Sequence, residues 1–227
     1  MDDIIDDTKI DNTMLKEFST SKKILFVLFN YLTFFLLILT LLIGINIGIV
    51  WALATLYLFP PILARLVLLI FPIKNTHIPF GSAEFMTWWF LSSLQTIFSR
   101  FPFLEELLRS VPSLYSMWLR LWGAKIGKMT FWAPNTTILD RSFLEIGDFV
   151  SFGMGVRLNP HVIATNDEGE RELLLASIII GDHSLIGGYS LLTTGTEICP
   201  NETTNSFLRS PPFCTWKDKK RIKKPKR

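Results

Sequence analysis

The chain divides into an apolar N-terminal half and a C-terminal half with a six-residue period. Residues 24–73 contain one charged residue, Arg65. One transmembrane helix needs roughly 20 apolar residues, so this stretch is long enough for two. A soluble helix of this composition would have no polar face to present to water. We therefore predict two membrane-spanning helices, with a break within residues 44–48 and a kink or an end at Pro60-Pro61.

The flanks of the apolar block set its expected orientation. Residues 1–23 form an acidic leader that we expect to be disordered. Lys22, Lys23 and Lys74 lie on either side of the block, and basic residues mark cytoplasmic ends. We therefore expect a membrane protein with both termini and the C-terminal domain in the cytoplasm. The late start and the length of the block argue against a cleaved signal peptide. Arg65 either extends to the membrane interface or marks a functional polar site.

Residues 74–122 combine aromatic and polar side chains. Trp favours the headgroup zone, so we expect interfacial amphipathic helices here, with Trp88 and Trp89 at the membrane surface. A third span or a core helix beneath the next domain are the alternatives. Pro102 and Pro112 punctuate the region, which predicts short helices at 103–109 and 113–122.

Large apolar residues then recur every six positions. A two-residue slip and a longer interruption separate three groups: Ile126, Trp132 and Ile138; Ile146, Phe152 and Leu158; Ile180, Ile186, Leu192, Ile198 and Thr204. The next residue is usually Gly or small. This period fits neither an α-helix nor a hairpin meander and predicts a triangular parallel β-coil, with one inward side chain per face. A β-sandwich of short strands is the alternative.

Charge and cysteine content change this picture little. The net charge of +3 comes from the tail, because Lys217–Arg227 holds eight basic residues and one Asp. A nucleic-acid-binding domain is therefore not indicated. We assign residues 209–227 as a basic tail, either drawn to anionic lipids or simply solvated. Cys199 and Cys214 are interpreted as free thiols.

The segments "IGDFVSFGMGVRL" and "IIIGDHSLIGGYSLLTTGTEI" resemble the hexapeptide-repeat acyltransferases. The upstream "LYSMWLRLWGAKIG" is similar to the lead-in of membrane-fused members, including C-terminal regions of some nonribosomal peptide synthetases. This resemblance implies an all-β left-handed parallel β-helix over 123–208, preceded by transmembrane and interfacial α-helices. It also implies a homotrimer.

The resemblance further implies an activity. Members transfer an acetyl or other acyl group from acyl-CoA, such as acetyl-CoA, or from an acyl carrier protein, to a hydroxyl or amine. No metal is expected. The acceptor class is a lipid-linked molecule, a glycan or a peptide, and the membrane anchor favours one delivered by the membrane.

The resemblance also implies the site residues. His161, just before the predicted loop Ala164–Ser177, would be the general base that removes the acceptor's proton. Apart from the resemblance, an imidazole base needs an orienting partner, and the carboxylates of that loop are the candidates. We expect His183 to project outward with a structural role, and His77 is a weaker candidate. The candidates for orienting His161 are Asp167, Glu168, Glu170 and Glu172, and the expected donor-binding residues are Gly187, Gly188 and Ser206.

Two other functions compete with acyl transfer. A zinc-dependent, carbonic-anhydrase-like enzyme would share the β-helix, but it needs about three histidines at suitable spacing, which His77, His161 and His183 do not have. A non-catalytic, membrane-tethered β-helix scaffold would not need His161 or the acidic loop that follows it.

Overall fold

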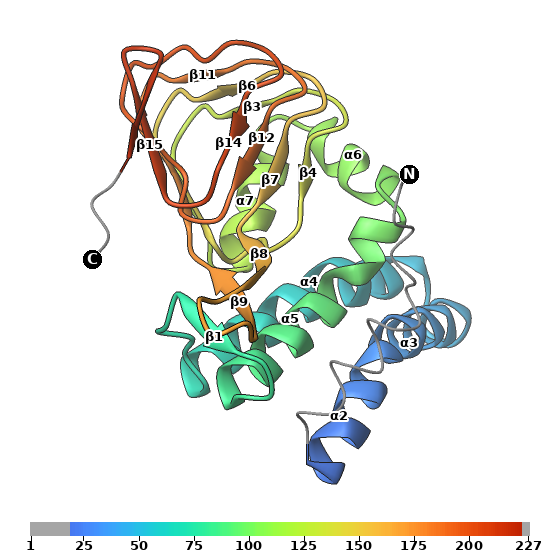
Figure 1. The fold of residues 1–227 in the computed structure, drawn as a ribbon. Helices are drawn as coiled ribbons and strands as arrows, with labels where there is room; N and C mark the ends of the chain where they lie inside the picture. The colour runs from blue at the N-terminus through green and yellow to red at the C-terminus, as the bar shows by residue number, and fades with distance from the viewer. Residues whose placement is uncertain (1–18, 224–227) are drawn as a thin grey trace, which may run out of the picture.

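A computed structural model describes residues 19–223. Residues 1–18 of the predicted disordered leader and the last four residues of the predicted basic tail lie outside the described residues. A β-coil stands on a layer of helices (Figure 1). The helices are α2 (Thr20–Asn30), α3 (Leu32–Asn46), α4 (Ile49–Ile70), α5 (Ala83–Arg100), α6 (Phe103–Arg109) and α7 (Leu114–Leu121).

The apolar block folds into a helical hairpin. Helices α3 and α4 pack along each other and are joined at Ile47 and Gly48. Pro60 and Pro61 lie inside α4, which continues to Ile70 and does not end at the two prolines. By length and composition α4 is able to cross a membrane, and α2 with α3, bent by 43°, forms a second such segment.

Helix α5 lies between the hairpin and the coil. Ser82 caps it by accepting a hydrogen bond from the N–H of Phe85 at 3.1 Å. Trp88 and Gln95 are each only 2% exposed. The expectation that Trp88 lies at the membrane surface was therefore wrong, because its side chain packs inside the protein. At this position α5 is the core helix that the sequence left as an alternative.

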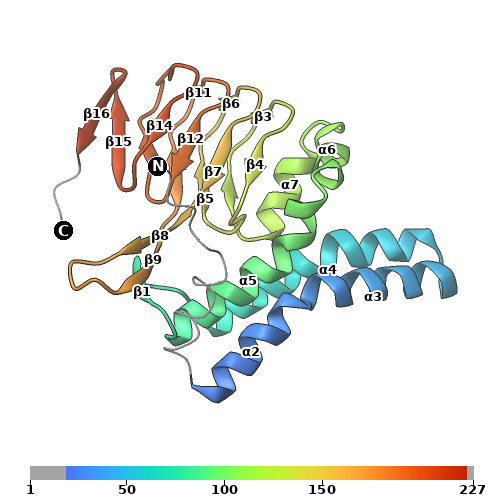
Figure 2. The ribbon, with the colours of Figure 1, turned by 45° about the vertical axis from the view of Figure 1, so that its right-hand side comes forward.

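The C-terminal half forms three parallel sheets that the chain visits in turn, and their strands stack as a three-sided coil (Figure 2). The left-handed turn of the coil stays a prediction. The first sheet contains β2 (Lys125–Ile126), β5 (Leu144–Ile146), β10 (Ile178–Ile180), β13 (Glu197–Ile198), β15 (Cys214–Lys217) and, antiparallel at its end, β16 (Lys220–Lys223). The second contains β3 (Phe131–Trp132), β6 (Ser151–Phe152) and β11 (Leu185–Ile186). The third contains β4 (Thr137–Ile138), β7 (Arg157–Asn159), β12 (Leu191–Thr193) and β14 (Arg209–Ser210).

The predicted inward positions are confirmed. All eleven residues of the six-residue pattern are less than 10% exposed. Inward residues of successive coils pair directly, as Phe152 does with Ile186. The glycines that follow the inward residues lie where a side chain would collide. A Cβ on Gly187 would lie 2.4 Å from backbone atoms of Asn205 and Ser206, so the next coil excludes it. The turn itself is made two residues later, where Tyr189 has a φ of 55°.

The coil continues beyond residue 208, so the assignment of residues 209–227 as a tail was wrong up to residue 223. Ser210 is 2% exposed and Trp216 pairs with Ile198. The six-residue spacing persists, but a buried serine at one inward position hid it.

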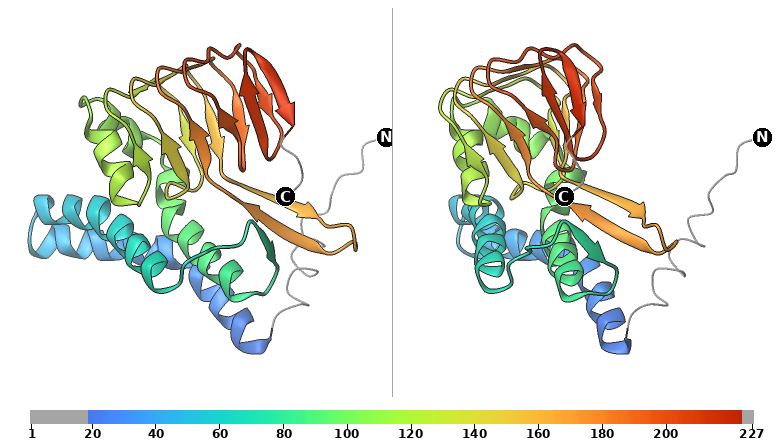
Figure 3. Two further views of the ribbon diagram at one scale, coloured as in Figure 1. Left: turned by 90° about the vertical axis from the view of Figure 1, so that its left-hand side faces the viewer. Right: turned by 60° about the vertical axis from the view of Figure 1, so that its left-hand side comes forward.

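The predicted loop at 164–177 is a β-hairpin instead. Strand β8 (His161–Thr165) pairs antiparallel with β9 (Arg171–Leu175). Strand β1 (His77–Pro79), from the segment between α4 and α5, pairs with the other edge of β9. The hairpin leaves the coil and connects it to the helical layer (Figure 3).

Candidate active site

Both interruptions of the six-residue period fall on one edge of the coil, between the third sheet and the first. The two-residue slip between Ile138 and Ile146 includes Asp140 and Arg141, and the longer interruption begins just before His161. Successive coils stack at about 4.8 Å, so consecutive interruptions bring their residues side by side.

Asp140 and His161 form a buried pair at this edge. The Nδ1 atom of His161 contacts Oδ2 of Asp140, and the indole Nε1–H of Trp88 donates to Oδ1 at 2.9 Å. Asp140 is 1% exposed, whereas the imidazole of His161 is 20% exposed. The Trp88 and His161 rings meet edge to face, with their centroids 4.8 Å apart. Both oxygens of the carboxylate are therefore used, and one side of the imidazole remains accessible.

The carboxylate at His161 is not one of those we expected. Glu172 accepts from Nδ1 of His77 at 3.0 Å. Asp167, Glu168 and Glu170 are exposed in the β8–β9 turn. Because the insertion forms a hairpin that projects away from the coil, its acidic turn does not reach the base of β8.

Asp140 sets the protonation of His161. Burial lowers the pKa of the imidazole, but the charge and hydrogen bond of Asp140 outweigh burial and raise the pKa above 6.5. A carboxylate only accepts hydrogen bonds, so Nδ1 carries a proton and donates it. In neutral His161 the other nitrogen, Nε2, is then an unprotonated base.

An ion cluster behind the pair fixes the chain at Asp140. The backbone N–H of Arg141 donates to Oε1 of Gln95 at 2.8 Å, and its guanidinium binds Glu105, with Nε–Oε1 at 2.8 Å. Arg109 donates to the other oxygen of Glu105 at 2.7 Å. Gln95 lies on α5, Glu105 and Arg109 lie on α6, and Arg141 lies in the slip. The side chains of all four are buried. The cluster thus anchors the residue next to Asp140 to two helices outside the coil.

Asp140 and Trp88 were missed by the sequence analysis. The signal for Asp140 was present, because the slip adds two charged residues between buried apolar positions. Nothing in the sequence indicated Trp88, since its contact depends on how α5 packs against the coil.

The expected donor-binding residues lie on a different edge from His161. Gly187, Gly188 and Ser206 follow the second sheet, whereas His161 follows the third. The N–H of Gly187 donates to Oγ1 of Thr204 at 3.0 Å, so it is not free for a ligand. One copy of the chain therefore does not bring this set together.

The other histidines have local partners. His183 is exposed at a turn, and its ring stacks on Phe149 with centroids 5.0 Å apart. The His77 ring stacks on Phe213 at 5.8 Å. Within residues 19–223 there is no group of three potential metal ligands, and Cys199 and Cys214 form no disulfide. A hollow of about 660 Å³, lined partly by Arg65 and Arg120, lies away from His161.

No protein-family model and no curated protein sequence matches the chain. Several solved structures are similar in part. A maltose O-acetyltransferase from Clostridium difficile is 17% identical with a TM-score of 0.37, covering 57% of this chain and 86% of its own. A hexapeptide-repeat acetyltransferase from Vibrio cholerae, in complex with acetyl coenzyme A, is 15% identical with a TM-score of 0.36, covering 54% of this chain and 82% of its own. A galactoside acetyltransferase in complex with coenzyme A is 16% identical with a TM-score of 0.30, covering 50% of this chain and 74% of its own. Likenesses this weak establish nothing about the chemistry of this chain.

Proposed function

We propose that the protein is a membrane-anchored acyltransferase in which His161 is the general base. The observation that carries the proposal is the buried Asp140 carboxylate, which orients His161 and receives a second hydrogen bond from Trp88. Burying a carboxylate is costly unless partners such as His161 and Trp88 satisfy its hydrogen bonds. A scaffold that only mediates assembly has no need of such an arrangement.

The pair fits the chemistry of acyl transfer. An alcohol becomes a good nucleophile when a base removes its proton during attack. Nε2 of His161 accepts the proton of the acceptor hydroxyl or amine while the acceptor oxygen or nitrogen bonds to the thioester carbonyl carbon. The carbon–sulfur bond then breaks, and the same proton passes from Nε2 to the departing sulfur. The products are an ester or amide and a free thiol, so His161 ends as it began. Asp140 stabilises the imidazolium in between.

The donor is an acyl-CoA, such as acetyl-CoA, or an acyl carrier protein. The acceptor is a lipid-linked or otherwise membrane-delivered hydroxyl or amine. The apolar helices support this choice, since tethering the site to a bilayer raises the effective concentration of such an acceptor. The lysines that flank the apolar block support a catalytic domain on the cytoplasmic side.

A homotrimer is part of the proposal. His161 and the edge with Gly188 and Ser206 are separated within one chain, so a neighbouring copy is needed to bring the two together. The second sheet and its edges also expose large apolar side chains, which supports contact with another copy. These are Met129, Phe131, Phe149, Leu185, Tyr189 and Phe207, between 47% and 71% exposed.

The test is release of free thiol from acetyl-CoA and longer acyl-CoAs by detergent-purified protein, with a membrane-lipid extract as the acceptor pool. We expect release that depends on the extract and falls about 10²–10⁴-fold in His161→Ala. Mass shifts in the extract then identify the acceptor.

His183→Ala is the matched control, because it removes an exposed histidine from the regular part of the coil and leaves the proposed site intact. It is expected to keep wild-type turnover. Equal turnover in wild type and His161→Ala would remove the role proposed for His161. No turnover with any acyl-CoA or acyl carrier protein would leave the scaffold as the better description.

A further inference from the structure

We infer that α2, α3 and α4 lie within a single leaflet of the bilayer, with the α3–α4 hairpin entering and leaving from the same side. The sequence alone predicts two spans, and the structure gives reasons to replace them. The inference rests on the membrane anchoring in the proposed function but not on the acyl-transfer chemistry.

The first reason is the position of the coil beside α4. Arg65, in the C-terminal half of α4, lines one hollow together with Lys125, Asp148 and Asp182, which belong to three successive coils. Figures 2 and 3 show the coil stack alongside the helical layer, with the hairpin tip beyond α6. If α4 crossed the bilayer along its own axis, these charged coil residues would enter hydrocarbon, where charge is costly.

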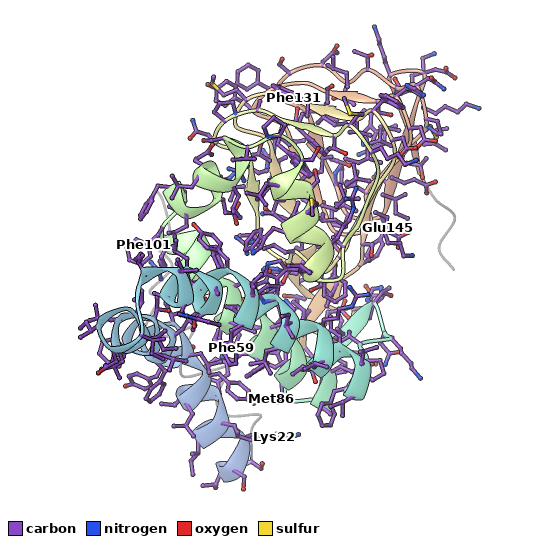
Figure 4. The ribbon with its side chains drawn as sticks, turned by 180° about the vertical axis from the view of Figure 1, so that it is seen from behind. Lys22, Phe59, Met86, Phe101, Phe131 and Glu145 are labelled. Atoms are coloured by element: carbon purple, nitrogen blue, oxygen red, sulfur yellow. The ribbon has the colours of Figure 1, made fainter. Side chains whose placement is uncertain are left out.

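The second reason is an apolar face that follows the helical layer along its whole length. On α4 the exposed residues Trp51, Leu58, Ile62, Leu66 and Leu69 recur at helical spacing. The face continues on α2 and α3 with Ile24, Val27, Leu28, Phe34, Phe35, Ile38, Leu41, Leu42 and Ile45. Figure 4 shows the helical layer from behind and labels Phe59, another exposed apolar residue of α4. Arg65 instead donates to the carbonyl of Arg120 at 3.2 Å, on the coil side. A face of this length fits a leaflet that covers all three helices.

The third reason is the tip of the hairpin, which is apolar. Ile45 and Ile47 are 72% and 64% exposed. The side-chain amide of Asn46 donates to the carbonyl of Leu42 at 2.8 Å, and the N–H of Gly48 donates to the carbonyl of Ile43 at 3.1 Å. These two hydrogen bonds pair polar groups of the turn within the hairpin, and an unpaired polar group in hydrocarbon is costly.

The dimensions agree with one leaflet. A helix with its side chains is about 10–12 Å across. Half of the hydrocarbon core is about 15 Å, so one layer of helices fits within a leaflet. Gly44 faces Ala52 across the hairpin, where a Cβ on residue 44 would lie 3.4 Å from Cβ of Ala52, so small residues meet where the two helices pack.

Single-cysteine labelling tests the inference. In a Cys199→Ala, Cys214→Ala background, Ile47→Cys reports the hairpin tip and Thr203→Cys the coil. A membrane-impermeant maleimide is added to sealed vesicles of each orientation. We expect Thr203→Cys to react from one side only, and Ile47→Cys to react from neither side until detergent is added. Reaction of Ile47→Cys from the side opposite Thr203→Cys would restore the two-span hairpin. Reaction from the same side would place the tip in water and overturn the inference.

A charge at the tip gives a second measurement that needs no cysteine background. A spanning hairpin places residue 47 in water and tolerates Ile47→Asp, whereas a tip within the leaflet does not. We expect Ile47→Asp to be extracted by alkaline carbonate and Thr203→Asp to remain with the membrane. Equal retention of both variants contradicts the inference. Extraction of the wild-type protein would reject anchoring as a whole, whereas an inactive protein that stays membrane-bound affects only the proposed chemistry.

Discussion

The coils from Ile180 to Trp216 keep an unbroken six-residue period, whereas the two coils before them are interrupted on the same edge. In the regular coils, positions beside the inward residues are fitted to the next coil, so that a Cβ on Gly181 would lie 2.4 Å from the nitrogen of Pro200. In the interrupted coils, the extra residues include Asp140 and Arg141, each 1% exposed. In the regular part, the six-residue spacing is thus set by the packing of one coil on the next. Asp140 and His161 lie where the six-residue period is interrupted, and departures from a local sequence pattern are expected at functional sites.

The largest expected effect follows from removing the charge of Asp140. Asp140→Asn keeps the shape of the side chain, but it no longer fixes Nδ1 as the donor or stabilises the imidazolium. We expect kcat/KM to fall by about 10²–10⁴-fold. The acid limb of the pH profile should also move. In the wild type it lies above 6.5, because Asp140 raises the pKa of His161. In the variant burial alone acts and lowers the pKa, so the limb moves to lower pH.

The Asp140–His161 pair should also make the stability of the fold depend on pH. A raised pKa in the folded state means that the protonated Asp140–His161 pair stabilises the fold fully below pH 6.5. This contribution declines as pH rises through the raised pKa. Melting temperatures measured from pH 5 to 9 should fall across that window in the wild type and not in Asp140→Asn. A parallel decline in both proteins would show that another group is responsible.

The next largest effect comes from the ion cluster under the interrupted edge. Glu105→Gln leaves the Arg141 guanidinium buried without its counter-charge, and breaking a buried pair costs about 3–5 kcal/mol. Glu145→Gln is the matched control in an exposed pair, where Lys125 lies 3.2 Å away and is 76% exposed. That change should cost at most about 1 kcal/mol. Chemical denaturation in detergent measures both, and similar losses would show that the cluster does not stabilise the interrupted coils.

The regular coils are probed by two adjacent glycines. Gly187→Ala places a Cβ against backbone of the next coil and should cost about 1–3 kcal/mol through overpacking. Gly188→Ala meets the carbonyl oxygen of Met154 at 3.1 Å, which a small shift relieves, so the loss should be smaller. Neither change should alter the pH profile of the enzyme. If Gly188→Ala were the more destabilising of the two, the stacking of coils would not be what requires glycine there.

This contrast also explains what the sequence predicts well. The coil is readable because its period repeats, and inward residues such as Ile180 and Leu192 need only be large and apolar. The predicted pattern ended before Ser210, because a polar residue occupies the inward position there. His161 was found through resemblance, but its partner was not. A contact such as that of Trp88 with Asp140 joins residues far apart in sequence, and no local pattern records how α5 packs on the coil.

The smallest expected effect on activity among the changes at the proposed site is that of Trp88→Phe, which tests whether α5 belongs to the site. Trp88→Phe keeps an aromatic ring against His161 but removes the indole N–H that donates to Asp140. Losing a hydrogen bond to a charged group costs about 1.5–3 kcal/mol. Without this donor the carboxylate is less compensated and holds the imidazolium more strongly, so the acid limb should move to higher pH, opposite to Asp140→Asn. We expect kcat/KM at neutral pH to fall about tenfold or less. A Trp88→Phe protein that is less stable but has the wild-type pH profile would confine Trp88 to packing. An upward shift would mean that the proposed site is built by the coil and the helical layer together.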